Sequence, residues 1–356
     1  MIKRRDVLGT TAAAATTLLA APAVHAGPTY RWKMVTSWPS KAPGPGITAE
    51  RLGQRIEQLS GGRIQIKLYA AGELAPALEV LDVVGQGAAE LGHTAAVFWQ
   101  GKHPASAFFM AVPFGLMPLE HMAWIYHGGG QALWDELYQS FNVKPFMAGN
   151  TGISMGGWFR QPVNSLDELK GLKYRMPGLG GAVLERLGGL PVTIPPGEIM
   201  AALQAGVVDG AEFAGPWNDL ALGFHRVAPY YYSPGWHESN GSSECIINRA
   251  LWDELPDDLQ SVIEHACAAE NAIALAEAEW RNAAALDTLL SRYGVQLSVF
   301  PPEVLTAMRQ TAQEVISELA AADPLSGRIH ASYEQARQQA MAWARVSSQA
   351  FQQARG

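Results

Sequence analysis

The chain has 356 residues, of which 48% are hydrophobic and 17% are charged. This composition excludes a disordered or collagen-like chain, and two cysteines are too few for a disulfide-stabilised scaffold. With 26 basic and 33 acidic residues the formal net charge is −7, which argues against a nucleic-acid-binding surface. The length allows one large or two medium domains.

Residues 1–26 resemble a cleaved export signal of the bacterial kind. Three basic residues at positions 3–5 precede a weakly apolar run rich in Ala, Thr and Leu, and residues 24–26 are typical of a signal peptidase site. The order of residues 4–8 resembles a twin-arginine signal, although a Sec signal also fits. The sequence therefore predicts a periplasmic protein.

Cys245 and Cys267 are the two cysteines of the chain. An oxidising compartment permits a disulfide between them, but neither their spacing nor their context requires one. Two separately buried thiols are the alternative.

Strand and helix patterns alternate along the chain, as in an α/β protein with short connections. Residues 48–59 have helical character and end at a Gly-Gly pair, and residues 63–69 alternate polar and apolar side chains like a half-buried strand. A capping box at residues 165–168 begins a short helix. The elements expected after it are strands at 173–176 and 191–194, and helices near 182–187 and from 198.

Two twelve-residue segments, 79–90 and 198–209, share one pattern. Each has apolar residues at helical spacing, a glycine where the helix would end, and then an acidic residue before a strand. The repeat predicts two similar α/β lobes with a ligand cleft between them. The predicted boundaries are 27–151 plus 239–300 for lobe I, and 152–238 for lobe II.

The C-terminal region, 301–356, is predicted to be helical because it is rich in alanine and poor in glycine. Small and apolar residues recur there with alternating spacings of four and three, which is a heptad seam. The seam consists of Ile329, Tyr333, Ala336, Ala340, Trp343, Ser347 and Ala350. It either packs on the body of its own chain or meets a partner helix, and we expect a homodimer.

One pair of motifs suggests a hydrolase. Gly152-Ile153-Ser154-Met155-Gly156 fits the G-x-S-x-G pattern of a nucleophilic serine, and His127-Gly128-Gly129-Gly130 resembles an oxyanion-hole loop. A nucleophile elbow needs a helix directly after the serine, whereas residues 156–162 are extended and end in proline. The sequence also has no HExxH, P-loop or CxxC motif. An exported serine hydrolase using Ser154 is therefore the weaker alternative.

Three charged residues lie inside segments that are otherwise apolar and rich in glycine and aromatic residues. Arg175 ends a predicted strand, and its partner is either an internal carboxylate or the carboxylate of a ligand. Glu212 and Glu238 are either surface acids or residues of the cleft. If both face the cleft beside an anionic ligand, a cation such as Na⁺ or Ca²⁺ would relieve their repulsion.

Taken together, these segments resemble the periplasmic solute-binding proteins of TRAP (tripartite ATP-independent periplasmic) transporters, and in particular their 2-oxo-acid-binding branch. The similarity rests on residues 149–159, 169–178, 215–219 and 234–238 and extends over nearly the whole mature chain. It implies a two-lobed α/β periplasmic-binding-protein fold of the type II kind, with hinge strands and a long C-terminal helix. It also implies a membrane permease as partner and no catalysed reaction.

The resemblance further implies roles for single residues. Arg175 would pair with the substrate carboxylate, while Glu212, the Phe213 carbonyl oxygen and Glu238 would hold a bridging Na⁺ or Ca²⁺, with Ser154 nearby. The residues expected to line the pocket are Asn150, Ser154, Phe213, Trp217, Phe98 and Trp99.

Two positions depart from the pattern of the branch. Ser154 replaces a glutamine that binds both metal and substrate, and Phe213 replaces a frequent tryptophan. Both changes enlarge the pocket, and the shorter serine reaches a cation only through water. The expected ligand is a small 2-oxo or 2-hydroxy acid of the pyruvate and lactate class. The binding protein of an ATP-driven (ABC) importer is a further alternative, because it has the same lobed architecture.

Overall fold

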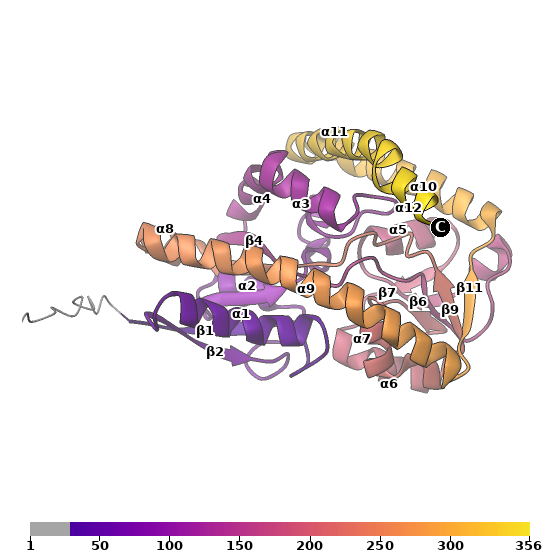
Figure 1. Cartoon of the computed structure of the whole chain (residues 1–356), viewed down its shortest axis with the longest axis horizontal. Coiled ribbons are helices and arrows are strands. Elements are labelled where there is room, and N and C mark those ends of the chain that lie inside the picture. The colour runs from indigo at the N-terminus through magenta and orange to yellow at the C-terminus, as the bar shows by residue number, and fades with distance from the viewer. Residues whose placement is uncertain (1–28) are drawn as a thin grey trace, which may run out of the picture.

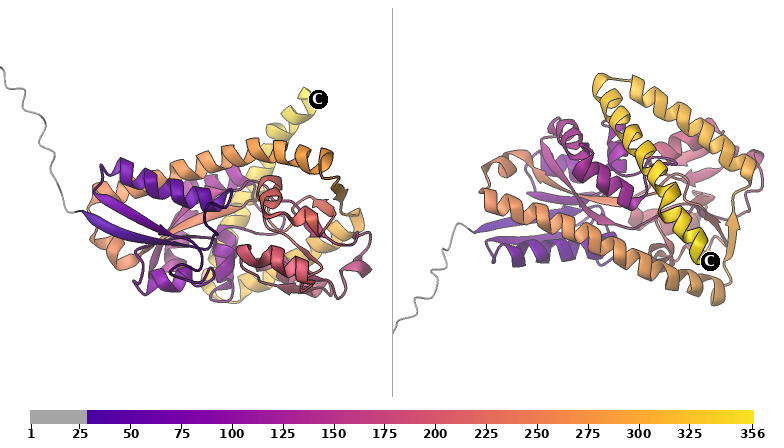
Figure 2. Two further views of the ribbon diagram at one scale, coloured as in Figure 1. Left: turned by 90° about the horizontal axis from the view of Figure 1, so that it is seen from below. Right: turned by 45° about the horizontal axis from the view of Figure 1, so that its top comes forward.

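The computed structural model describes residues 29–356, so the predicted export signal lies outside the described residues. The chain forms two β-sheets that lie side by side, each flanked by helices, and long C-terminal helices run across them (Figures 1 and 2). This arrangement confirms the predicted two-lobed α/β class.

The first sheet has five strands in the order β2-β1-β3-β10-β4, and β10 is antiparallel to both of its neighbours. Strands β3, β4 and β10 are almost wholly buried. The edge strand β2 is only half-buried, and it alternates as the sequence predicts. The strands are β1 (Tyr30–Thr36), β2 (Ile64–Tyr69), β3 (Leu91–Thr94), β4 (Val143–Asn150) and β10 (Ser242–Asn248).

The second sheet has six short strands in the order β11-β9-β5-β8-β6-β7. Its two central neighbours, β5 and β8, are antiparallel, and β6 is parallel to both β7 and β8. The strands are β5 (Gly157–Phe159), β6 (Lys173–Arg175), β7 (Leu190–Val192), β8 (Gly210–Ala211), β9 (Tyr230–Ser233) and β11 (Gln296–Val299).

The last of these strands departs from the expected division, which assigned residues 239–300 to lobe I. β11 pairs with β9 and so belongs to the second sheet. The reason is α9 (Asp257–Ser291), whose 35 residues span about 52 Å at 1.5 Å per residue. This helix packs on β4 and α1 (Pro45–Leu59) of the first lobe and on α7 (Pro216–Leu222) of the second, and it carries the chain from one lobe to the other (Figure 1).

The internal repeat corresponds to one structural unit in each lobe. Helix α2 (Val80–Gly85) leads into β3 of the first sheet, and α6 (Ile199–Ala205) leads into β8 of the second. After each helix a glycine adopts a left-handed conformation, Gly87 at φ 76° and Gly206 at φ 70°. The same helix–strand unit therefore delivers one strand to each sheet.

The remaining helices cover the sheets and the lobe boundary. Among the described helices, none is both long and apolar enough to span a bilayer. The α-helices are α1 (Pro45–Leu59), α3 (Pro118–His127), α4 (Gly130–Gln139), α5 (Gly178–Arg186), α7 (Pro216–Leu222) and α8 (Arg249–Glu254). The 3₁₀ turns are η1 (Ala96–Trp99), η2 (Pro104–Phe109), η3 (Leu166–Leu169), η4 (Pro196–Glu198) and η5 (Phe224–Arg226).

The heptad seam is divided between the core and the surface. Ile329 and Tyr333 are buried against α3, α4 and η2, whereas Trp343 is 69% exposed. The first half of the seam therefore packs on its own chain, and the second half leaves apolar side chains open. The helices of this region are α10 (Pro302–Ala321), α11 (Pro324–Val346) and α12 (Ser348–Arg355).

Cys245 on β10 and Cys267 on α9 are both free and buried in one apolar cluster of the first lobe. Burial, together with the neighbouring Cys245, raises the pKa of the Cys267 thiol well above its usual range. The two cysteines are therefore not joined by a disulfide, as one of the two expectations had it, but their thiols are buried together in one cluster and not separately.

Candidate functional site

A small cavity lies between the two lobes, at the ends of strands from both sheets. Trp38 and Phe98 line it from the first lobe, and Arg175, Glu212 and Phe213 line it from the second. Its volume is only about 30 Å³. The two lobes therefore approach each other closely here and leave a narrow space in front of Arg175 and Glu212.

Arg175 is the last residue of β6, and only 2% of its surface is exposed. Its Nη1 atom lies 2.5 Å from Glu212 Oε1 and 2.9 Å from the Glu212 carbonyl oxygen, and its Nε donates to the Ile194 carbonyl oxygen at 3.2 Å. Within residues 29–356, Nη2 donates no hydrogen bond. Since Arg175 lines the cavity, this nitrogen is the donor that remains for a ligand carboxylate.

Glu212 follows β8 and is held in its charged form by two neighbours. Its Oε1 accepts from Arg175 and its Oε2 lies 3.1 Å from His237 Nε2. Burial alone would raise the pKa of Glu212, but the charge of Arg175 and the His237 contact hold that pKa below its usual value. The internal partner that the sequence left open for Arg175 is therefore Glu212, and the pairing occupies only part of the guanidinium.

Glu238 lies in the loop after β9, and its pKa is shifted in the direction opposite to that of Glu212. Its Oε1 accepts a 2.6 Å hydrogen bond from Ser154 Oγ. Burial and the nearby charge of Glu212 raise the pKa of Glu238 to about 7. Two buried carboxyl groups thus share this end of the cavity; their surroundings favour the ionised form of Glu212 and oppose the ionised form of Glu238.

The oxygen donors around these carboxylates fit a hard cation. Glu212, Glu238, the Phe213 carbonyl group and the Ser154 hydroxyl offer oxygen atoms only, which Na⁺ and Ca²⁺ prefer. An ionised carboxylate has about four acceptor sites, and Glu212 uses two of them. In the described part of the chain no three His, Cys, Asp or Glu side chains form a metal cluster, so a cation here needs backbone and ligand oxygens as well.

Asn150 does not line the cavity, and its side chain instead makes hydrogen bonds to segments that lie next to it. At the end of β4, its Oδ1 accepts from the Gly152 backbone N–H at 2.8 Å, and its Nδ2 donates to Asn240 Oδ1 at 2.8 Å. Asn150 therefore links residues 151–156 to residues 234–241, the two short crossings in which the chain passes from one lobe to the other. Thr151, the next residue, lines the cavity instead.

The structure places Trp99 and Trp217 away from the cavity. In η1, successive side chains point about 120° apart, so Phe98 faces the cavity while Trp99 enters the core. The Trp99 Nε1 atom donates to Glu244 at 2.7 Å. Trp217, on α7, stacks under Arg281 of α9, whose guanidinium carbon lies 5.1 Å from its ring centre.

Several lining residues had no local signal in the sequence. Trp38 follows β1 and donates from Nε1 to His93 Nδ1 at 2.7 Å, and Ser243 belongs to the buried strand β10. Neither is a charge in an apolar segment or part of a motif. Only the closure of the chain brings them to Arg175.

Ser154 does not have the environment of a nucleophile. It lies in the connection between β4 and β5, so that a strand follows it and not a helix. Its hydroxyl donates to Glu238, and the neighbouring His237 contacts Glu212 instead. The geometry that the hydrolase alternative requires is therefore missing at this serine.

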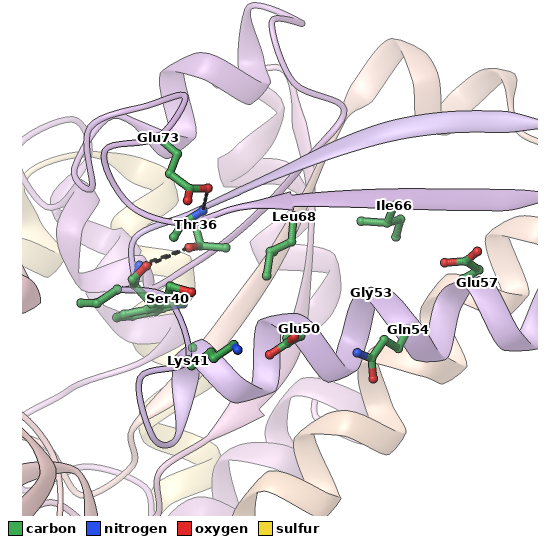
Figure 3. Close-up of a pocket in the computed structure, with 14 residues that line it drawn as sticks. Thr36, Ser40, Lys41, Glu50, Gly53, Gln54, Glu57, Ile66, Leu68 and Glu73 are labelled. Atoms are coloured by element: carbon green, nitrogen blue, oxygen red, sulfur yellow. Dashed lines mark hydrogen bonds between the residues drawn. The ribbon is translucent and has the colours of Figure 1, made fainter.

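A larger hollow of about 330 Å³ lies on the first lobe alone, between α1 and the strands β1 and β2. Figure 3 shows Glu50 and Glu57 on α1 facing the strand that carries Ile66 and Leu68. All of its lining residues fall between positions 36 and 73, and three of them are glutamates against one lysine. This acidic, single-lobe surface is a poor site for an anion that lobe closure must trap.

A cavity between two α/β lobes, with a buried arginine that retains a free donor, is the arrangement of a solute-binding protein that takes an anion between its lobes. The chain matches the family of bacterial extracellular solute-binding proteins, family 7, over residues 34–323. It belongs to this family.

Three relatives extend this match. A monocarboxylate 2-oxoacid-binding periplasmic protein of Nostoc sp. is 40% identical over 359 residues, covering 99% of this chain and 98% of the relative. A TRAP transporter solute-binding protein from Bordetella bronchiseptica, solved as a mixed-occupancy dimer with copurified calcium and picolinate, has a TM-score of 0.89 at 38% identity, covering 92% and 97% of the chains. One from Pseudoalteromonas atlantica, with sodium and pyruvate bound, has a TM-score of 0.89 at 36% identity, covering 91% and 99%.

These matches confirm the predicted family and exclude the alternatives. The chain is a solute-binding protein of the TRAP kind and not an enzyme, so the serine hydrolase alternative is wrong. The ABC-importer alternative is likewise replaced by the TRAP family.

Proposed function

We propose that this chain is the periplasmic binding subunit of a TRAP transporter and that it captures a small monocarboxylate, a 2-oxo or 2-hydroxy acid of the pyruvate class. The observation that carries this proposal is Arg175, which is buried and partly neutralised by Glu212 yet keeps Nη2 free at the cavity. A ligand carboxylate there would gain charge-assisted hydrogen bonds of about 1.5–3 kcal/mol each. The ligands named for the Nostoc, Bordetella and Pseudoalteromonas relatives support the same chemical class.

The other residues divide into walls and cation donors. Phe98 and Phe213 form the apolar walls, and the small cavity excludes large acids. Glu212, Glu238 and the Phe213 carbonyl oxygen would hold a Na⁺ or Ca²⁺, with Ser154 positioning Glu238 through its hydrogen bond. The cation would supply a positive charge that neutralises the paired carboxylates beside an anionic ligand. No organic cofactor takes part.

Lobe closure would couple ligand capture to recognition by the permease. The mobile bodies are the two sheets with their helices, joined by the crossings near residues 151–156 and 234–241 and by α9. A bound acid contacts both bodies, so it favours the closed form by its differential affinity for it. The permease would then bind the surface that the two closed lobes present together.

The test is isothermal titration calorimetry of pyruvate in buffer with NaCl and CaCl₂. We expect Arg175→Lys, which keeps a charge for Glu212 but loses the planar fork, to weaken binding at least tenfold. Arg309→Ala removes an exposed arginine from α10 and serves as the matched control with unchanged affinity. Unchanged affinity in a folded Arg175→Lys protein would refute the proposal.

A homodimer through the C-terminal helices remains part of the proposal. Trp343, Val346 and Phe351 are 69%, 72% and 66% exposed, which is unusual for large apolar side chains grouped at one end of a chain. One solved relative is a dimer, which agrees with this expectation. Light scattering should give a dimer for the wild type and a monomer for Trp343→Glu, whereas equal masses would contradict the assignment.

A further inference from the structure

Trp38 lies between the ligand cavity and the larger hollow of the first lobe. It lines both the cavity of about 30 Å³ and the hollow of about 330 Å³, and it is only 4% exposed. On the cavity side, its ring centre is 6.0 Å from that of Phe98. The orientation of this indole therefore decides how much of the space in front of Arg175 is open to a ligand.

A single hydrogen bond holds the indole of Trp38. The backbone is fixed separately, because its N–H donates to Thr36 Oγ1 at 3.3 Å and its carbonyl oxygen accepts from the Ala71 N–H at 2.9 Å. Neither of these contacts restrains the side-chain torsions. The indole Nε1–H donates to His93 Nδ1 at 2.7 Å. Since tryptophan has only this one donor, the indole has none left for a ligand and serves the cavity as a wall.

His93 is held in the form that accepts this hydrogen bond. It is fully buried on β3, where it pairs with Thr36 of β1 and Cys245 of β10. Its Nε2 lies 3.2 Å from the Ala148 carbonyl oxygen, which only accepts, so Nε2 carries the proton and Nδ1 is the acceptor. Burial lowers the pKa of His93 to about 4, so the ring is uncharged at neutral pH. Because His93 and Trp38 belong to the same lobe, the wall is in place before the lobes close.

We propose that His93 is a positioning residue that fixes the Trp38 indole as the first-lobe wall of the cavity and thereby limits the size of the acid that Arg175 receives. The inference rests on the proposed function, since the acid must lie at Arg175. One methylene that does not fit a rigid apolar pocket is discriminated against by about 10- to 200-fold. Without His93 the indole N–H has no buried partner, and the hollow on its other side gives the ring room to turn away. Bulkier acids should then gain affinity relative to pyruvate.

The experiment compares the dissociation constants of pyruvate and 3-methyl-2-oxobutanoate by calorimetry. Wild type should bind the branched acid more weakly, and His93→Leu, which offers the indole no acceptor, should narrow this difference at least tenfold. His93→Asn should keep the wild-type ratio, because the amide oxygen takes the place of Nδ1 as acceptor. Glu244→Gln is the matched control with an unchanged ratio, since it alters the acceptor of Trp99, a buried tryptophan that does not line the cavity.

A second measurement requires no substitution at His93. The NMR signal of the Trp38 Nε1–H, assigned by its loss in Trp38→Phe, should exchange with D₂O at least tenfold more slowly than that of Trp280, which is 82% exposed. The ligand-free wild type is used, because the hydrogen bond lies within one lobe. Equally fast exchange at both tryptophans would overturn the fixed wall, even if His93→Leu does not fold.

The outcomes separate this role from the proposed function. If pyruvate binds but the ratio of the two dissociation constants is the same in wild type and His93→Leu, the positioning role is refuted and the proposed function stands. The same holds if His93→Asn shifts the ratio as far as His93→Leu does. If the wild type binds neither acid, the proposed function fails, and the role of His93 in selecting acids fails with it.

Discussion

Gly178 provides the sharpest test of the closed geometry. It is the first residue of α5, has φ +73°, and faces Val97 of the opposite lobe. A Cβ built on Gly178 would lie 2.3 Å from Val97 Cγ2, whereas real Cβ atoms essentially never approach a neighbouring atom within 3.0 Å. The close approach exists only when the lobes are closed, so Gly178→Ala should oppose closure and not folding of either lobe.

The expected magnitude follows from two separate contributions. An alanine at positive φ costs about 1–2 kcal/mol in any state that keeps this backbone. The contact with Val97 adds an overpacking cost of about 1–3 kcal/mol in the closed state alone. Because ligand binding is coupled to closure, that second contribution should raise the dissociation constant of pyruvate by about 5- to 150-fold.

Gly171 offers a matched control. It has the same φ of +73°, but a Cβ there would meet no atom within 4 Å. Gly171→Ala should therefore lower the thermal midpoint of the ligand-free protein by the backbone contribution alone and leave the pyruvate affinity unchanged. Calorimetry and thermal unfolding of both variants separate the two effects. Equal pyruvate affinities for Gly178→Ala and Gly171→Ala would refute the interlobe contact.

Two further predictions concern buried carboxyl groups. Burial raises the pKa of Glu244 from 4.5 to about 7, so the folded state retains a proton that the unfolded state loses between these values. The free energy of unfolding should fall by about 3 kcal/mol as pH rises from 4.5 to 7 through this group, and Glu244→Gln should remove that part of the pH dependence in urea titrations at pH 5 and 8. If the free energy of unfolding changes by the same amount between pH 5 and pH 8 in the variant and in wild type, the assignment is contradicted. Cation binding needs ionised Glu238, whose pKa in the ion-free site is raised to about 7 by burial and by Glu212. The apparent Ca²⁺ affinity measured with pyruvate present should drop about tenfold from pH 8 to pH 6, and a pH-independent affinity would exclude Glu238 as a ligand.

The sequence predicts the fold best where one face of an element is exposed. The edge strand β2 alternates and was predicted, whereas β3, β4 and β10 are buried on both faces and carry no alternation. The expectation that residues 239–300 belong to lobe I does not hold for β11. This strand pairs with β9 because the 35-residue helix α9 ends beside the second sheet. Helix–strand repeats were more informative, since each lobe reuses the same short unit.

For the site, charged residues in apolar segments were the useful signal. Burial of Arg175, Glu212 or Glu238 is costly, so their sequence context marked them as candidates, but it left open whether the two glutamates are surface acids, and the family resemblance was needed to bring all three into one site. Trp38 and Ser243 line the same cavity, but neither is a charged residue in an apolar segment. Phe98 faces the cavity and Trp99 does not, because neighbouring side chains of the 3₁₀ turn η1 point in different directions. The pairing of Arg175 with Glu212 required the register of β6 beside β8.

The two sheets are linked by three passages of the chain, two short crossings and α9, after which α11 returns to the first lobe by packing on α3, α4 and η2. Each half is consequently assembled from pieces that are distant in the sequence, and neither corresponds to one uninterrupted stretch that could be expressed on its own. A single proteolytic nick in any one connection would leave the halves still tethered by the other two. Fragment studies of this protein must therefore rejoin segments, for example by circular permutation, before either half can be expected to fold.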